Sequence, residues 1–151
     1  MPISISRATS ADLESLLPMI RHMRQDDPWS EPFQESTVRA SLDELLRNPL
    51  YGVVYIVRGE VQPIGYLVVC FDYSLEYRGK GAWIDELFVE SSHRGKGIGT
   101  QLLDQAERSS REHNAKFLHL EVTHGNPAIE LYRRRGFQDH QRYLMSKALD
   151  K

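Results

Sequence analysis

The 151-residue sequence has a single cysteine, Cys70, so no disulfide can form within the chain. Cys70 lies in the apolar run IGYLVVCF without an activating motif, and we interpret it as a small buried hydrophobic residue rather than a catalytic thiol. The sequence also lacks a basic N-terminal segment followed by a long apolar core, and it has no stretch that could span a membrane. These absences predict a soluble protein in a reducing, cytoplasmic setting.

Charge of one sign is not in excess either. The net charge is -2 and the pI is near 6.3, so there is no basic field that would imply nucleic acid or an anionic membrane as a partner. The six histidines show no metal-ligand spacing with cysteines or acids, and we expect no metal. No linker or shift in composition divides the chain, which predicts a single domain over residues 1–151.

The stretch from Ala82 to Leu103 organises the rest of the sequence. It begins as an apolar, strand-like run that carries two adjacent carboxylates, Asp85 and Glu86, and it continues into a basic, glycine-rich turn. From Ile98 onward apolar residues recur four apart, which predicts a helix that begins inside the turn. The order is therefore strand, glycine turn, helix.

This junction predicts an anion-binding site. The first N–H groups of a helix have no intrahelical partner and, with the helix dipole, attract phosphate. Glycines at 95, 97 and 99 let a ligand approach the backbone, while Arg94 and Lys96 add positive charge. The run GKGIGT has neither the GxGxxG spacing of a dinucleotide fold nor the GK[ST] ending of a P-loop, which disfavours a nucleotide-binding protein.

Two motifs give the chain a family resemblance. The order Arg94-x-x-Gly97-x-Gly99 resembles the R/Q-x-x-G-x-G/A signature of the GCN5-related N-acetyltransferases (GNAT), whose backbone amides hold the pyrophosphate of acetyl-CoA. The run from Asn126 to Phe137, NPAIELYRRRGF, is similar to the segment that follows the fifth strand in the same family. Two motifs in the right order are harder to obtain by chance than one.

The resemblance implies an α/β, GNAT-type (acyl-CoA N-acyltransferase) fold: a mixed, mostly antiparallel central sheet of about six to seven strands, flanked by about four helices. Periodicity predicts strands near Ile3–Ile5, at Tyr51–Arg58, Ile64–Tyr73, Ala82–Val89, Lys116–Val122 and Gln141–Lys147. Helices are expected at Leu13–Met23, Val38–Leu46, from Ile98, and at Asn126–Arg135, with a capping box at Thr9-x-x-Asp12 before the first.

The resemblance also implies where acetyl-CoA binds. The cofactor of this family lies where the central strand and the next parallel strand splay apart. Carried onto this sequence, the cofactor-binding residues are Leu87, Phe88, Val89, Arg94, Gly95, Lys96, Gly97, Ile98, Gly99, Thr100, Asn126 and Tyr132.

Three residues are candidates for catalysis. An alkyl ammonium group titrates near pKa ~10, so an attacking amine must lose a proton at neutral pH. Adjacent residues of a regular strand face opposite sides of the sheet, so only one of the two acids can easily serve as the base. We assign this role to Glu86, which would take the proton through a water molecule, because its side chain is longer. Asp85 is then free to bind a cationic substrate. A bulge could exchange these roles, and the alternative is that both acids only anchor loops. Tyr132 matches the family tyrosine that protonates the leaving thiolate.

The loop from Asp26 to Phe33 is a candidate wall of the acceptor site. Asp27 and Trp29 together could hold a cationic, partly apolar substrate, with Asp85 as a further contact; the alternative is a solvated turn. In the resembled family this region usually lines the acceptor site.

The predicted function is transfer of the acetyl group of acetyl-CoA to a primary amine of a small molecule. The segment from Phe71 to Val89 is similar in layout to the polyamine and diamine acetyltransferase branch, so a polyamine-like acceptor is expected. The alternatives are a non-catalytic acyl-CoA-binding regulatory module and an acetyltransferase that acts on a protein N-terminus or lysine. The resemblance also allows a homodimer.

Overall fold

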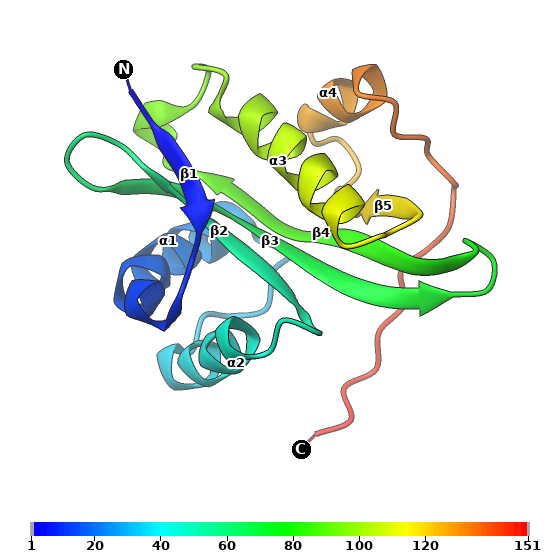
Figure 1. The fold of residues 1–151 in the computed structure, drawn as a ribbon, viewed down its shortest axis with the longest axis horizontal. Helices are drawn as coiled ribbons and strands as arrows, with labels where there is room; N and C mark the ends of the chain where they lie inside the picture. The colour runs from blue at the N-terminus through cyan, green and yellow to red at the C-terminus, as the bar shows by residue number, and fades with distance from the viewer. Residues whose placement is uncertain (1, 151) are drawn as a thin grey trace. The chain divides into compact units, whose positions relative to one another are not determined.

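The computed structural model describes residues 2–150, which form four α-helices, two short 3-10 helices and one five-stranded sheet (Figure 1). The strands are β1 Ser4–Arg7, β2 Gly52–Arg58, β3 Pro63–Ser74, β4 Gly79–Val89 and β5 Phe117–Leu120. The helices are η1 Ser10–Asp12, α1 Leu13–Asp26, α2 Glu35–Arg47, η2 Ser91–His93, α3 Ile98–Glu112 and α4 Ala128–Arg134. In this range no helix has the length and apolar composition needed to cross a membrane.

The described residues form two compact units, the first ending at Glu121 and the second beginning at Val122. The first unit contains the whole sheet together with α1, α2 and α3. The second contains α4 and the C-terminal segment, and each unit is considered by itself below.

The strand order in the sheet is β1-β2-β3-β4-β5. Neighbours from β1 to β4 are antiparallel: short turns join β2 to β3 and β3 to β4, and α1 and α2 lie in the chain between β1 and β2. In contrast, β5 runs parallel to β4 after the crossover through α3. This is the mixed, mostly antiparallel sheet of the expected fold class, which is confirmed, with five strands in place of about six to seven.

Helices cover both faces of the sheet. On one face α1 and α2 pack over β2, β3 and β4, and the core there is built from Leu16, Leu17, Ile20, Leu42, Val54, Ile56, Tyr66, Val68 and Phe88. On the other face lies α3, whose buried residues include Ile98, Leu102 and Ala106, as their spacing predicts (Figure 1). Because both faces are covered, the β2 run from Gly52 to Val57 is buried without alternation.

Capping and turn residues in the sequence correctly predicted the ends of several helices and strands. The capping box forms as expected: the Thr9 side chain accepts from the Ala11 N–H at 3.3 Å, and Asp12 Oδ2 accepts from the Thr9 N–H at 2.9 Å. The second helix ends at Arg47, before Asn48-Pro49, and the hairpin of β2 and β3 forms around the predicted turn.

One predicted strand is absent from the described residues. Residues 138–150 have no regular secondary structure, so the expected strand at Gln141–Lys147 was wrong. Tyr143 and Met145 alternate with polar residues, yet they are 90% and 88% exposed. Alternation describes which side chains would share a face, but a strand also needs a neighbouring backbone for its hydrogen bonds. The strand expected at Lys116–Val122 is shortened to β5, although the Lys116 N–H still donates to the Lys80 carbonyl of β4 at 2.8 Å.

The buried contact between α1 and the sheet gives a test of stability. Leu16 is 0% exposed, so Leu16→Ala should lower the free energy of unfolding by about 2–5 kcal/mol through lost burial and a residual cavity. The matched control is Leu75→Ala at a residue that is 92% exposed, which should change it by less than about 0.5 kcal/mol. Urea denaturation measures both; equal effects would contradict this packing.

Candidate active site

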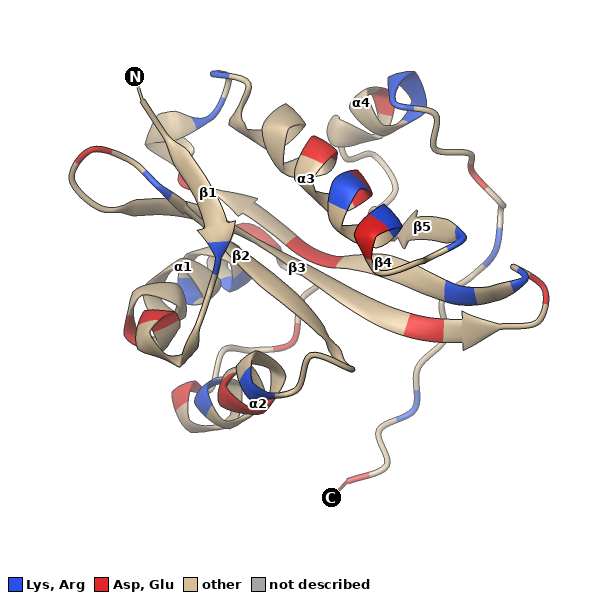
Figure 2. Cartoon of the chain, viewed as in Figure 1, with Lys and Arg blue, Asp and Glu red and all other residues tan. Residues whose placement is uncertain are grey.

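The middle of β4 contains a β-bulge. Val68 of β3 pairs with Glu86, but the next residue, Val69, pairs with Ile84, so Asp85 is an extra residue without a partner in β3. The alternation of side chains is therefore interrupted at the two carboxylates, which form the acidic stretch of β4 in Figure 2. The regular alternation that we assumed for Asp85 and Glu86 was wrong, and the bulge considered as its alternative is present.

Glu86 is held by two partners from different elements. The hydroxyl of Tyr66, on β3, donates to Glu86 Oε1 at 2.7 Å, and Nη2 of Arg24, on α1, lies 3.3 Å from Oε2. The Glu86 side chain is 16% exposed, and Tyr66 is 0% exposed. A carboxylate this well enclosed needs such partners, because an unpaired buried charge is costly.

The environment raises the pKa of both carboxylates of β4. For Glu86, burial raises the pKa and outweighs the opposing effects of the Tyr66 hydrogen bond and the Arg24 charge. For Asp85, burial likewise raises the pKa while Arg24 opposes it. Asp85 has an exposed surface, so water moderates its shift more than that of the enclosed Glu86. A carboxylate with a raised pKa is a better match for proton transfer near neutral pH.

Glu86 lies on the α1 side of the sheet, where it contacts Arg24 of α1 and Tyr66 of the core packed against that helix, and both carboxylates affect the ionisation of groups on β3. Burial, and then the charges of Asp85 and Glu86, raise the pKa of the Cys70 thiol to about 11. The pKa of Tyr66 is raised by burial first and next by Glu86, so its hydroxyl stays protonated and donates. Cys70 is a free thiol, half-buried rather than fully buried, and its raised pKa agrees with an unreactive residue.

The glycine turn after β4 has the backbone that its sequence requires. Gly95 and Gly97 have φ values of +75° and +80°, which side-chain-bearing residues rarely adopt. Gly97 is the N-cap residue of α3, and no side chain of the described chain caps this helix. The first N–H groups of α3 therefore point to a terminus that a ligand can occupy.

Gly99 supplies an independent sign of a ligand. It lies in the first turn of α3 with ordinary φ, and a Cβ atom built there would meet nothing within 4 Å. Neither backbone strain nor packing within the described chain requires glycine at this position. Close approach of a ligand to the backbone would account for it, and the turn fits the pyrophosphate group of acetyl-CoA.

The edge of β4 that continues toward this turn is open. The pairing of β4 with β5 ends at Ile84 with Leu120, so among the described residues the stretch from Asp85 to Val89 has no partner on that edge. Apart from the Val89 carbonyl, which accepts from Arg94 Nε at 2.8 Å, its backbone groups are open to a ligand with amide groups. Of the predicted cofactor residues here, Phe88 and Val89 have buried side chains and Leu87 is half-buried, so each would contribute its backbone.

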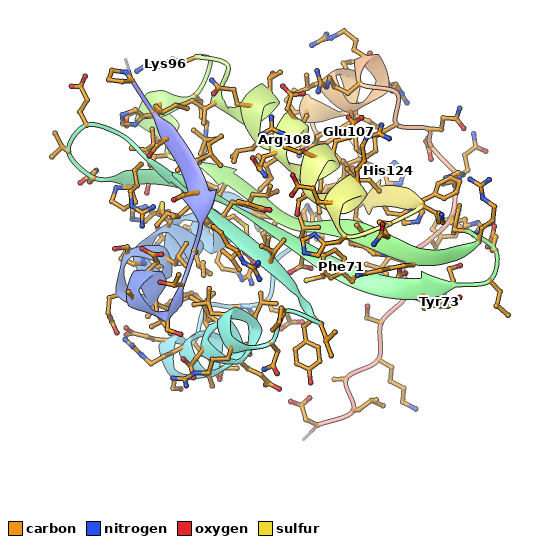
Figure 3. The ribbon with its side chains drawn as sticks, in the orientation of Figure 1. Phe71, Tyr73, Lys96, Glu107, Arg108 and His124 are labelled. Atoms are coloured by element: carbon orange, nitrogen blue, oxygen red, sulfur yellow. The ribbon has the colours of Figure 1, made fainter. Side chains whose placement is uncertain are left out.

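The two cations of the turn have partners within the chain. Arg94 Nε donates to the Val89 carbonyl at 2.8 Å, and its Nη2 lies 2.6 Å from Asp26 Oδ2 at the end of α1. Lys96 Nζ donates to the Ser92 carbonyl at 3.2 Å; Figure 3 labels it on the turn before α3. Arg94 thus fastens the turn to β4 and α1, a role that the sequence did not suggest.

The loop after α1 is ordered by Asp27. Its Oδ1 accepts from the Trp29 N–H at 3.0 Å and its Oδ2 from the Ser30 hydroxyl at 2.9 Å. A hollow of about 330 Å³ adjoins this loop and is lined by Arg21, Arg24, Gln25, Asp27, Pro28, Ser30, Glu31, Pro32 and Phe33. Trp29 is 80% exposed and does not line it. Arg24 belongs both to the hollow and to the partners of Glu86.

The second unit contains the other two predicted site residues. Asn126 Oδ1 accepts from the Ala128 N–H at 2.9 Å and so caps the first turn of α4, one residue before the N-cap position, which is Pro127. Tyr132 lies on α4, half-buried, with its ring edge-on to Phe137 at a centroid distance of 6.0 Å. Burial raises the pKa of Tyr132, which keeps its hydroxyl protonated. Within residues 2–150 no group of three or more histidine, cysteine, aspartate or glutamate side chains could hold a metal.

Sequence reasoning missed Tyr66 and Arg24. Tyr66 lies in the apolar run of β3, where a tyrosine looks like an ordinary core residue, although a buried phenol needs a polar partner. Arg24 lies in the last turn of α1, where a basic residue is usual. The sequence feature that could have led to both residues is Glu86 itself, since an acid in a buried strand requires a hydrogen-bond donor and a cation nearby.

Comparison with known proteins defines the class. Residues 17–137 match the acetyltransferase (GNAT) family, and the chain belongs to this family. The matched range includes β4, the glycine turn and α4, the elements that carry the predicted site residues.

Two curated relatives match part of the chain. The streptothricin acetyltransferase of Streptomyces lavendulae is 51% identical over 55 residues, which cover 36% of this chain and 29% of the relative. The uncharacterized N-acetyltransferase MJ1207 of Methanocaldococcus jannaschii is 33% identical over 82 residues, which cover 53% of this chain and 36% of the relative. The chain thus spans about a third of the length of these relatives.

Solved structures share the fold. An integron cassette protein, HFX_CASS3, from the mobile metagenome of Cole Harbour Salt Marsh superposes with a TM-score of 0.84. The alignment covers 97% of this chain and 91% of that protein at 24% identity, which establishes the similarity of fold.

Gly99 provides a test that separates ligand binding from stability. Gly99→Ala should leave the melting temperature unchanged or raise it, because alanine favours a helix by up to about 1 kcal/mol over glycine. The added methyl group should weaken acetyl-CoA binding at least about tenfold, measured by calorimetry.

The control for this prediction is Gln101→Ala on the exposed side of α3. It should keep the affinity of the unaltered protein. Undiminished acetyl-CoA affinity in the Gly99 variant would show that the ligand does not approach this backbone.

Proposed function

We propose that the protein is an acetyl-CoA-dependent N-acetyltransferase that acts on a primary amine of a small molecule. The observation that carries this proposal is the open edge of β4, which runs from the enclosed Glu86 toward the uncapped start of α3. A thioester held along this edge would have its acetyl group near a carboxylate with a raised pKa. The family match supports the same activity.

Residues of the glycine turn and of β4 would hold the cosubstrate. Backbone N–H groups between Gly95 and Thr100 suit the pyrophosphate, and the backbone from Leu87 to Val89 suits the amide groups of pantetheine. Asn126 is proposed as a further contact through its side chain. Acetyl-CoA supplies an activated acetyl group when bound.

Glu86 is the proposed general base. Its carboxylate would take a proton from the acceptor amine, directly or through one water, since only the neutral amine is nucleophilic. Asp85, which is more exposed, would attract the ammonium form of the acceptor before that proton is lost. The Coulomb attraction of two neighbouring carboxylates favours a cationic acceptor.

Tyr132 is the proposed general acid. A phenol whose pKa is raised by burial keeps its proton at neutral pH and can donate it to a leaving thiolate. Its position on α4, after the Asn126 cap, agrees with the family segment from which the role was inferred.

A polyamine-like amine remains the proposed acceptor class. Support comes from the acids Asp85 and Glu86 and from the hollow beside the Asp27 loop. The name of the Streptomyces lavendulae relative states that it acetylates streptothricin, so acceptors of that kind belong in the same test.

The test is release of the CoA thiol from acetyl-CoA with polyamines, aminoglycosides, streptothricin, amino acids, peptide N-termini and peptide lysines as acceptors. Turnover with small amines is expected. Turnover confined to peptides would make the protein a protein acetyltransferase. Acetyl-CoA binding without turnover on any acceptor would favour a regulatory acyl-CoA-binding module.

Tyr132→Phe should lower kcat about 100-fold or more with saturating amine, because it removes the proposed proton donor. The Kd for acetyl-CoA should change little, since the ring itself remains. Stopped thiol-release assays and calorimetry measure the two quantities. An undiminished kcat would refute the acid role, and a raised Kd with normal kcat would make Tyr132 a binding residue.

A further inference from the structure

We propose that Arg24 is a positioning residue for Glu86, and that Arg24 and Tyr66 together leave Oε2 of Glu86 as the oxygen that accepts the proton from the acceptor. This inference rests on the proposed function, because it assigns roles within the same site. It concerns residues that neither motif of the family contains.

Tyr66 is the hydrogen-bond donor to the other carboxylate oxygen of Glu86, Oε1. Its hydroxyl donates to Oε1 at 2.7 Å, and the side chain is fully buried, with its ring 5.8 Å from that of Phe88. The ring is fixed by the core between α1 and the sheet, so the hydroxyl has little freedom to turn away. Oε1 therefore already accepts a short hydrogen bond from a donor that the core holds in place.

Arg24 holds Oε2 more loosely. The distance from its Nη2 to Oε2 is 3.3 Å, longer than the roughly 2.7–2.9 Å of a strong charge-assisted hydrogen bond. The other terminal nitrogen, Nη1, lies 3.7 Å from the sulfur of Met23, which is a weak acceptor. Oε2 can thus accept a hydrogen bond from an incoming amine or water without breaking a strong one.

Arg24 also lies on the route by which an acceptor would arrive. It lines the hollow beside the Asp27 loop and touches Glu86, and its side chain is 23% exposed. Two further contacts fix this part of α1 to β4 and the glycine turn: His22 Nδ1 lies 2.8 Å from Glu90, and Asp26 pairs with Arg94. The guanidinium therefore projects from an anchored helix.

The charges around Glu86 make Arg24 decisive for its ionisation. The groups that face it are Tyr66 and Cys70 from β3, Asp85 from β4 and Arg24 from α1. Of these Arg24 is the cation, and it opposes both burial and the negative charge of Asp85. Without it the pKa of Glu86 rises further, so the base is protonated up to a higher pH.

The test compares Arg24→Gln with Arg24→Lys, which keeps the charge, in profiles of kcat/KM against pH. The acid limb of the glutamine variant should move to higher pH, with at least about a tenfold loss near pH 6 that recovers at high pH. The lysine variant should stay close to the unaltered protein. Arg47→Gln, the same charge change on α2, is the control and should leave the limb in place.

A second readout does not depend on turnover. The carboxyl carbon of Glu86 is titrated by 13C NMR, assigned through Glu86→Gln, and its midpoint should rise in Arg24→Gln but not in Arg24→Lys. A uniform loss of activity at all pH values, with an unchanged Glu86 midpoint, would mean that Arg24 is only structural and would overturn the proposal.

Failure of the proposed function looks different. Turnover that survives Glu86→Gln would overturn the proton-accepting role of Oε2. If no acceptor turns over at all, the proposed function fails, and the NMR midpoint still decides whether Arg24 controls the ionisation of Glu86.

Discussion

The partial burial of two carboxylates in the middle of β4 is the constraint on which the site depends. An acid between two helix-covered faces costs free energy unless donors and a cation meet it. For Glu86 the chain meets this cost with Tyr66 from β3 and Arg24 from α1, next to the bulge at Asp85. A strand that served only the core would carry an apolar residue at Glu86, so the arrangement points to chemistry rather than to stability.

In the proposed complex the same strand also organises ligand binding. Its pairing with β5 stops at Ile84, which leaves its next five residues without a partner on that edge in the part of the chain that the structure describes. The chain then turns through Gly95 and Gly97 into α3, whose N-cap residue, Gly97, has no side chain to cap the first N–H groups. The open edge of β4 and the N-terminus of α3 follow one another along the chain, so one elongated ligand can bind to both.

Most of the helices and strands, and part of the candidate site, were predictable from the sequence. Periodicity placed α1, α2 and α3, because burial of one face repeats in the sequence, whereas two apolar runs on either side of a turn placed the β2–β3 hairpin. The glycine spacing identified the turn, and Asn126 identified the cap of α4. The bulge at Asp85 could not be predicted from the sequence, since it depends on the register between β3 and β4 and not on the residues of either strand alone. Arg24 is 62 residues from Glu86, and only the packing of α1 on the sheet reveals their contact. The strand expected at Gln141–Lys147 failed because side-chain alternation says nothing about a hydrogen-bonding partner.

The central claim is that acetyl-CoA lies along the open edge of β4 and ends at the glycine turn. Titration of the 15N-labelled protein with acetyl-CoA, followed by amide chemical shifts, tests it most directly. The largest shifts should fall on the amides from Asp85 to Val89 and from Gly95 to Thr100. Shifts confined to other elements, such as α2 or the β3–β4 hairpin, would contradict the account.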